Sequence, residues 1–501
     1  MSIAETAPGA PRAAERPAAA YPPKRARWVA MGVLLVAGFM NLIDVTIVNV
    51  ALPSMREALG ATEAQIEWVV AVYILTFALL LLPGGRYGDI LGKRRVFVAG
   101  IVVFTIGSAL CGLAPSIEVL VGARVAQAVG GAMMIPQTLA LVPSLFPPRD
   151  RGAAFAVFGL SAGLASVTGP LLGGVLIGAD LWGLGWRPIF LVNIPVGVAA
   201  VLLALRYLPR TGRRADMGQD FIGVGLAGAA LLLLVFPLIE GRALGWPLWC
   251  FLAMIASVPA ALAFVLWQRR QAARGGAQLL PASLLANRTY LLGTLMAAVL
   301  FSGMPGFFLV MALFLQSGFG LTPLQSGLTT VPFSVGVLIA SFIAGRLGNR
   351  WPRPRVTAGG GAMALAMTWL TFVISGTGDE IVRTEYWPPL LLAGLGLGTA
   401  VSPLFNTILA AVPERDTGSG SGALQAFQQV GGAFGVAIVA QIFFSSLNGS
   451  LAGGMAPHPA YEGAFILALT YVICAYGALA GMAWLLPPPG ALSRAAPPAS
   501  G

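Results

Sequence analysis

Two residues of opposite charge lie deep inside apolar stretches of the sequence. Asp44 falls within the run 28–52, and Arg124 falls within the run 117–142. A charged side chain at the centre of a bilayer costs at least about 2.5–3.5 kcal/mol, so each of these residues needs a role. At a helical rise of about 1.5 Å per residue, both lie ~10–12 Å from the same end of their runs. We therefore expect them to pair if their helices are neighbours.

A carboxylate that faces a guanidinium can work as a proton switch. The positive charge favours the ionised acid, and burial favours the neutral acid. A movement that separates Asp44 from Arg124 would let the carboxylate bind a proton, and the return movement would expel it. The alternative is a static ion pair that holds the two helices together. The two halves of the chain are related by an offset of 260 residues, which matches Asp44 with Met304. The predicted charge chemistry is thus confined to the first half of the chain.

Neutral polar residues predict the wall of a substrate cavity. Gln127 lies three residues after Arg124, on a neighbouring part of the same helix face. The three glutamines near residue 428 share a face at spacings of three and four residues. The predicted cavity residues are Asn41, Gln127, Thr138, Ser402, Phe405, Asn406, Gln425, Gln428 and Gln429. Phe405 and Phe427 are candidates to stack on a substrate. Hydrogen bonding and packing between helices is the alternative for all of them.

The segment 85–96 occurs twice in related form. It reads GRYGDILGKRRV, and residues 345–356 read GRLGNRWPRPRV, with five of twelve positions identical. The same shift of 260 residues superposes the first six apolar runs on the last six. Two halves in the same orientation are typical of transporters built from parallel repeats, whose binding site lies between the halves.

The composition explains why the elements around these residues must be membrane helices. Hydrophobic residues make up 57% of the 501 residues and charged residues 10%, against about 25% charged residues in soluble domains. A membrane helix needs about 20 mostly apolar residues. We predict fourteen spans: 28–52, 66–83, 96–113, 117–142, 153–178, 188–208, 220–240, 248–267, 290–315, 324–345, 356–375, 388–411, 419–445 and 462–486.

The positive charges support this count and predict the orientation. If the N-terminus is cytoplasmic, the cytoplasmic segments hold 25 of the 30 Lys and Arg residues and the outer loops hold four, with Arg124 inside a span. Such a bias is the positive-inside pattern. We expect a disordered cytoplasmic tail at 1–27, a six-helix bundle at 28–208, and a second six-helix bundle at 290–486. The segment 209–289 carries two extra helices of open purpose, and 487–501 is a second cytoplasmic tail.

Several motifs resemble one known family. The segment 85–95 resembles the signature loop of the major facilitator superfamily. Residues 41–53, NLIDVTIVNVALP, resemble the first helix of its fourteen-span drug/proton antiporters of the EmrB/QacA type. The segments 124–127, 169–174 and 185–195 resemble further motifs, with Ala128 and Pro188 departing from the usual Gly and Trp. The resemblance implies an all-α integral membrane protein with the major facilitator fold, in which two six-helix bundles carry two extra central helices.

The resemblance also implies two roles outside the ion pair. The signature loop would be a conformational latch formed by Gly85, Arg86, Gly88, Asp89, Gly92 and Arg94, in which Asp89 accepts from a helix N-terminus or pairs with Arg94. Positive-inside topology alone would account for the arginines but not for Asp89. The antiporter motif of the fifth span would comprise Gly169, Pro170, Gly173 and Gly174, and it is associated with export.

Other classes of function lack their residues. The chain has one His, and its three Cys lie inside apolar runs, so we expect neither a metal site nor a cofactor. The basic residues occupy short loops and do not form one soluble face, which argues against a nucleic-acid partner. A nucleotide-binding P-loop is absent from the sequence. An ion gradient is therefore the expected energy source.

We expect a monomeric secondary transporter in the cell membrane that exports amphipathic drugs, antibiotics or a related metabolite in exchange for protons, by alternating access. Proton-coupled uptake of a metabolite is the alternative. A membrane sensor without transport is a third hypothesis. A membrane-embedded enzyme is a fourth, but its usual cluster of acids or His is missing.

Overall fold

The computed structural model describes residues 21–212, 214, 218–242, 244–347, 351–378 and 381–486. All regular elements of these residues are helical. The first half comprises α1 (Lys24–Leu59), α2 (Glu63–Leu91), α3 (Lys93–Gly112), α4 (Ile117–Leu145), α5 (Pro148–Gly178), α6 (Pro188–Leu191) and α7 (Asn193–Tyr207). The second half comprises α11 (Arg288–Leu313), α12 (Pro323–Leu347), α13 (Pro352–Ser375), α14 (Trp387–Ala410), α15 (Thr417–Ala452) and α16 (Pro457–Met482).

Three further helices connect the halves: α8 (Phe221–Glu240), α9 (Leu248–Ala273) and the short α10 (Ala282–Ala286). Thirteen helices of the described residues are long and apolar enough to cross a membrane, with α6 and α7 counted as one span. The helix α5 occupies the predicted fifth span with 31 residues but is not among the thirteen. The all-helical membrane architecture is thus confirmed, whereas the count of fourteen stays a prediction.

Local sequence signals fix where the helices begin and end. Thr62 and Gln65 form a capping box at the start of α2, in which each side chain accepts from the backbone N–H of the other. Gly60 ends α1 at a φ of 61°, a left-handed conformation that glycine adopts without strain. The helix α1 begins at Lys24, slightly before the predicted boundary at residue 28. The predicted tail residues 1–20 and 487–501 lie outside the described residues.

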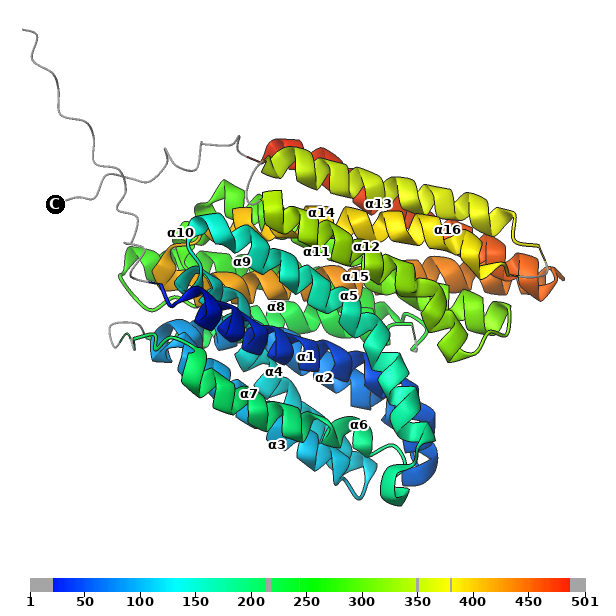
Figure 1. Cartoon of the computed structure of the whole chain (residues 1–501), viewed down its shortest axis with the longest axis horizontal. Helices are drawn as coiled ribbons and strands as arrows, with labels where there is room; N and C mark the ends of the chain where they lie inside the picture. Colours follow the sequence, from blue (N-terminus) through cyan, green and yellow to red (C-terminus); the bar gives the residue numbers. More distant parts are fainter. Residues whose placement is uncertain are drawn as a thin grey trace, which may run out of the picture.

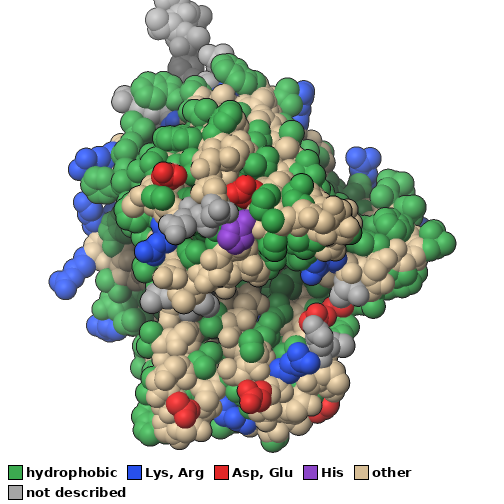
Figure 2. Space-filling model, turned by 90° about the vertical axis from the view of Figure 1, so that its right-hand side faces the viewer, with side chains coloured by type: hydrophobic (Ala, Val, Ile, Leu, Met, Phe, Trp, Pro, Cys, Tyr) green, Lys and Arg blue, Asp and Glu red, His purple; other side chains and the backbone are tan. Residues whose placement is uncertain are grey.

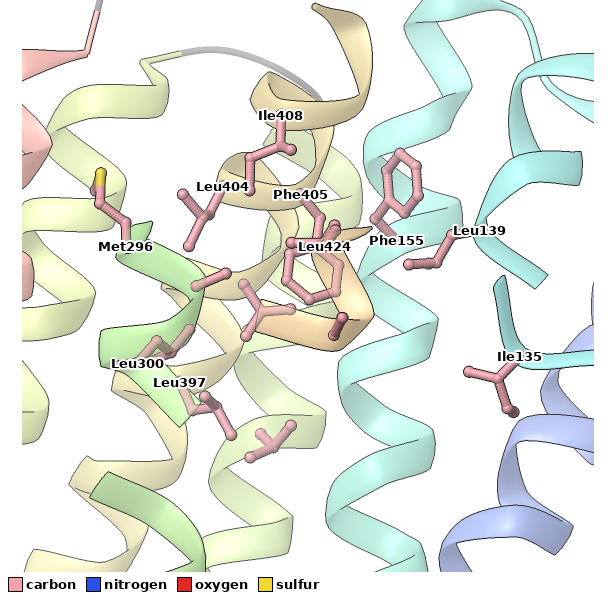
Figure 3. Packing of buried hydrophobic residues seen from close by; sticks show 14 of the residues in the cluster. Ile135, Leu139, Phe155, Met296, Leu300, Leu397, Leu404, Phe405, Ile408 and Leu424 are labelled. Atoms are coloured by element: carbon pink, nitrogen blue, oxygen red, sulfur yellow. The ribbon is translucent and has the colours of Figure 1, made fainter. Parts of the chain in front are cut away.

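The two halves meet through three helices of each half. In the first half these are α2, α4 and α5, and their main partners in the second half are α15, α12 and α14. Figure 1 shows the two groups of helices running side by side. In the close-up, Phe405 and Leu424 of the second half lie across from Phe155 and Leu139 of the first half (Figure 3). These apolar side chains lie where the two halves face one another (Figure 3).

The opposite ends of the halves diverge. The N-terminal end of α2 and the C-terminal end of α5 part from the second half on the right of Figure 1. Seen from that side, the surface has a furrow between an upper and a lower block of the molecule, and hydrophobic side chains line it (Figure 2). The halves are therefore in contact at one end and diverge at the other (Figure 1 and Figure 2).

The helices α8 and α9 lie along the seam between the halves. They form an antiparallel pair, and α8 packs against both α2 and α15. At one end Arg86 of α2 donates to the carbonyl oxygen of Gly218, 3.3 Å away. At the other end Trp246 Nε1 donates to Gln441 Oε1 of α15 at 2.9 Å. The segment just before α8 thus contacts the first half, and the loop between α8 and α9 contacts the second half.

Candidate functional site

The two buried charges form an ion pair inside the first half. Arg124 Nη1 lies 2.5 Å from Asp44 Oδ2. The side chains are 1% and 0% exposed, so α4 and α1 bring them together where water does not reach. The sequence predicted that they could meet, and the structure shows that they do. Arg124 donates to the carboxylate of Asp44.

Gln127 completes this pair rather than lining an open cavity. Its Nε2 donates to Asp44 Oδ1 at 2.7 Å, and its Oε1 accepts from Arg124 Nη1 at 2.6 Å. The same Nε2 also contacts Ser108 Oγ of α3 at 2.6 Å, and Asn193 of α7 donates to Ser108 at 3.1 Å. All five side chains are buried. We call Asp44, Ser108, Arg124, Gln127 and Asn193 the polar network.

The helix α2 contacts this network through Arg124. The guanidinium Nε donates to the carbonyl oxygen of Val69 at 3.0 Å. Its carbon Cζ lies 4.1 Å from the centre of the Tyr73 ring, a cation–π geometry. Asn41 donates to the Tyr73 hydroxyl at 3.1 Å, and its own Oδ1 is buried without a partner among the described residues. Asn41 and Tyr73 therefore lie beside the ion pair.

A second charged site joins the halves at the far end of α2. Asp89 Oδ1 accepts from the backbone N–H of Gly418 at 2.8 Å, and Oδ2 accepts from the N–H and the hydroxyl of Ser419 at 2.7 and 2.9 Å. These donors form the first turn of α15, where the helix dipole attracts an anion. Of the two predicted partners, the helix N-terminus is the observed one. Arg94 instead donates to the carbonyl oxygen of Leu205. We call the contact between Asp89 and α15 the latch, and its end of the molecule the latch end.

Glycines let the latch helices approach backbone to backbone. A Cβ atom on Gly85 would lie 2.2 Å from the carbonyl oxygen of Gly418, and one on Gly422 would lie 2.5 Å from that of Leu81. Gly88 packs against the side chain of Gln137, and Gly92 turns the chain between α2 and α3 at a φ of 98°. The glycines of the predicted latch thus serve close packing and the turn.

Two glycines of the predicted antiporter motif pack α5 onto α1. A Cβ atom on Gly169 would lie 1.9 Å from Thr46 Oγ1, and one on Gly173 would lie 2.9 Å from Ile47 Cγ1. Gly174 faces open space. Pro170 lies in the same helix, but its side chain is outside the described residues.

The remaining predicted cavity residues fall into different environments. Thr138 is buried and donates to the carbonyl oxygen of Ile135 in its own helix, so it faces no open space. Ser402 donates to the carbonyl oxygen of Gly152 at 2.9 Å, which makes it a contact between α14 and α5. Phe405 and Asn406 are each 5% exposed, and Gln428 is 8% exposed.

The predicted cavity residues of α15 and its Phe427 lie on different faces of the helix. Gln425 and Gln429 follow Gly418 and Gly422 on the stripe that faces α2, and they are half-buried where the halves begin to part. Phe427 lies on the opposite side of α15 from Gly418 and is 38% exposed. It therefore points away from the seam and is no candidate for stacking on a substrate between the halves.

Sequence reasoning missed four residues of these sites. Ser108 and Tyr73 carry no charge, and single polar residues in apolar runs are common enough to give no signal. Asn193 lies in the segment 185–195, whose resemblance to a family motif assigned it no role. Ser419 lies 330 residues from Asp89, and only the fold brings the two together. The one available signal was the start of an apolar run at residue 419, since helix N-termini bind anions.

The comparison with known proteins decides the family. Residues 34–436 match the family model of the Major Facilitator Superfamily. The chain belongs to the Major Facilitator Superfamily. Among its relatives in this superfamily, the probable actinorhodin transporter of Streptomyces coelicolor is 41% identical over 432 residues, which are 86% of this chain and 75% of the relative.

Other superfamily relatives have names that refer to resistance. The puromycin resistance protein of Streptomyces alboniger is 34% identical and is matched over 94% of this chain and 93% of its own length. The methylenomycin A resistance protein of Bacillus subtilis is 33% identical, with 85% and 89% covered. A proton:xylose symporter of the superfamily has a similar structure, with a TM-score of 0.64, 14% identity, and 92% of this chain and 96% of that chain covered.

Proposed function

We propose that this multi-pass membrane protein is an exporter that couples the outward movement of amphipathic drugs, antibiotics or related metabolites to the inward movement of protons. Three observations support this proposal. The superfamily is one of transporters, the similar relatives carry the names of antibiotic transport and resistance proteins, and the chain buries one carboxylate in a polar network. The last observation carries the proton coupling.

The polar network supplies a proton site with two states. In the structure Arg124 and Gln127 donate to the carboxylate of Asp44, and we assign this arrangement to the state without a proton. A proton on Asp44 removes the charge that Arg124 pairs with, and a buried unpaired guanidinium is costly. The loaded form must therefore rearrange around Arg124, and this rearrangement is the event that the proton drives.

The helix α2 is the element that can transmit this rearrangement to the latch. Arg124 contacts α2 at Val69 and Tyr73, and the latch residue Asp89 lies 16–20 residues further along the same helix. At about 1.5 Å per residue the two sites are ~24–30 Å apart along one continuous helix. A shift of α2 against α4 would move Asp89 relative to α15 and open the latch end.

The positive residues indicate which side of the membrane each end of the molecule faces. We place the latch end in the cytoplasm, with both termini, because the positive-inside pattern puts 25 of 30 basic residues there. The described conformation then faces outward in the cell membrane. One chain supplies both halves of the pathway, so we propose that a monomer is the transporting unit.

Reconstituted vesicles test this function. In proteoliposomes with an acidic lumen, an antiporter accumulates substrate as protons leave, and an alkaline lumen abolishes accumulation. Puromycin is a first probe because a relative is named for resistance to it. Accumulation only into alkaline vesicles would indicate proton-coupled symport instead. If the transport rates of puromycin and of all other tested compounds do not depend on the pH gradient, the proposal is contradicted.

A further inference from the structure

One face of α1 is directed towards the second half and forms the wall that the first half contributes to the space between them. Leu42 is 41% exposed and Asn49 lies on the same face seven residues later, also exposed. On one side of this stripe Asn41 bonds to α2, and on the other side Thr46 lies against Gly169 of α5. Because α2 and α5 are helices that touch the second half, the stripe between them faces the second half across the furrow.

Gln428 lies on the opposite wall with an unused hydrogen-bond donor. Seven residues before it, Ser421 donates to the carbonyl oxygen of Pro136 in α4, and seven residues after it, Gly435 packs on the carbonyl oxygen of Ser302 in α11. Residues seven apart share a helix face, so Gln428 is directed between these two contacts. Its Nε2 is buried without a partner among the described residues. A buried unpaired donor costs free energy, which a ligand carrying an acceptor would recover.

Two aromatic rings lie on α11 and α14, helices that both contact α15. Phe405 of α14 stacks on Phe301 of α11, with ring centres 6.2 Å apart and planes inclined by 27°. In Figure 3 Phe405 lies beside Leu424, which precedes Gln428 by one helical turn. Flat aromatic surfaces beside an amide donor suit a planar ring system that carries an oxygen acceptor.

The charges of the cavity disfavour a cation. The helices α11, α12, α14 and α15 contain no Asp or Glu in their sequences. In the first half, both oxygens of Asp44 are bound by Arg124 and Gln127. A cationic ligand would therefore lose its hydration without gaining a counter-charge.

We propose that the substrate is an uncharged, planar aromatic compound with a carbonyl acceptor, and that Gln428 Nε2 donates to this carbonyl while the rings stack near Phe405. This proposal names the substrate class of the exporter proposed above and rests on that function. According to this proposal, Gln428 makes the protein bind a quinone-like compound more tightly than the corresponding hydrocarbon.

Three probe compounds isolate the two parts of this recognition. 2-Methylanthraquinone and 2-methylanthracene share a three-ring frame and differ in two carbonyl groups, and ethidium is a planar cation. Equilibrium dialysis with the purified full-length protein measures their dissociation constants. We expect the quinone to bind about tenfold more tightly than the hydrocarbon, the effect of one hydrogen bond in a buried site, and ethidium to bind more weakly than the quinone.

Two substitutions at one position separate donor loss from charge gain. Gln428→Leu should weaken binding of the quinone about tenfold and change binding of the hydrocarbon less than twofold. Gln428→Glu should also weaken the quinone, and it should strengthen ethidium by supplying a carboxylate. Gln441→Leu is the matched control on the same helix, because Gln441 bonds to Trp246 outside the cavity. We expect it to leave all three affinities within twofold of wild type.

Several results would overturn the substrate class. These are wild-type protein that does not bind the quinone, equal binding of the quinone and the hydrocarbon, tighter binding of ethidium, or an equal loss for both neutral compounds in Gln428→Leu. Flux assays with the same probes separate this failure from that of the exporter. Proton-driven flux of ethidium alone would refute the class and leave antiport standing. Quinone binding that depends on Gln428, without any flux that depends on pH, would refute antiport and leave the class standing.

Discussion

The ion pair of Asp44 and Arg124 is buried and hydrogen-bonded to its neighbours. Both carboxylate oxygens and the shared Nη1 atom have partners, and all of them are buried. Removing one member of such a pair is expensive because the other charge stays behind, whereas removing both can be nearly neutral. This difference separates a structural effect from a functional one.

The double variant Asp44→Asn/Arg124→Gln should restore stability without restoring transport. We expect Asp44→Asn alone to lower the unfolding free energy by ~3 kcal/mol, the scale for breaking a buried pair. Thermal melting of the purified protein measures this, and the double variant should melt near wild type. If the double variant also transports substrate in a proton-dependent manner, the pair is a static connection and the proton site lies elsewhere.

Sequence reasoning reaches different depths for different residues. The deep charges Asp44 and Arg124 stand out in apolar runs, so their helices and relative depth could be predicted. Gln127 is predicted as a cavity residue and lies in the polar network, because an amide three residues from an arginine can face either way. Neutral partners such as Ser108 and Tyr73 look like ordinary helix residues, and only the packing of α3 and α2 onto α4 identifies them.

At the level of elements, α2 and α15 form the contact that closes the latch end. The backbone of Gly85 lies against that of Gly418, and Asp89 binds the first turn of α15. The resemblance of segment 85–95 implies a latch and offers a helix N-terminus as one partner of Asp89, but it does not identify α15, whose Ser419 lies 330 residues away. The helices α8 and α9, left open by the sequence, run along this same seam.

The substitution Gly85→Ala should prevent the latch from closing. Its Cβ atom would lie 2.2 Å from the carbonyl oxygen of Gly418, and backbone cannot move aside as a side chain can. We expect the rate of substrate flux to fall more than tenfold while the melting temperature changes little. Gly122→Ala is the control, because Gly122 has open space around its Cβ direction. A flux near wild type in Gly85→Ala would show that the close approach is unnecessary for transport.

At the scale of the whole molecule, the two halves must separate at the latch end during each cycle. A Cβ atom on Gly345 of α12 would lie 3.6 Å from the Cβ atom of Ala153 in α5. This separation suits a disulfide, whose Cβ atoms are about 3.5–4.5 Å apart. The position therefore offers a reversible bond across the halves.

The pair Ala153→Cys/Gly345→Cys should stop transport when oxidised. The three native cysteines, Cys111, Cys250 and Cys474, are first replaced by other residues. In this protein we expect oxidation of the introduced pair to abolish flux and a reducing agent to restore it. Each single cysteine variant should transport in both conditions. Full flux through the cross-linked protein would contradict alternating access by separation of the halves at this end.

Proton release from proteoliposomes tests the central claim most directly. Vesicles with an acidic lumen and a pH indicator outside would hold either wild-type protein or Asp44→Asn, and substrate from the quinone and antibiotic panel would start the reaction. The account predicts substrate-triggered proton release by the wild type and none by Asp44→Asn, with substrate binding retained. Proton release that survives in Asp44→Asn would contradict the assignment of the proton site to the polar network.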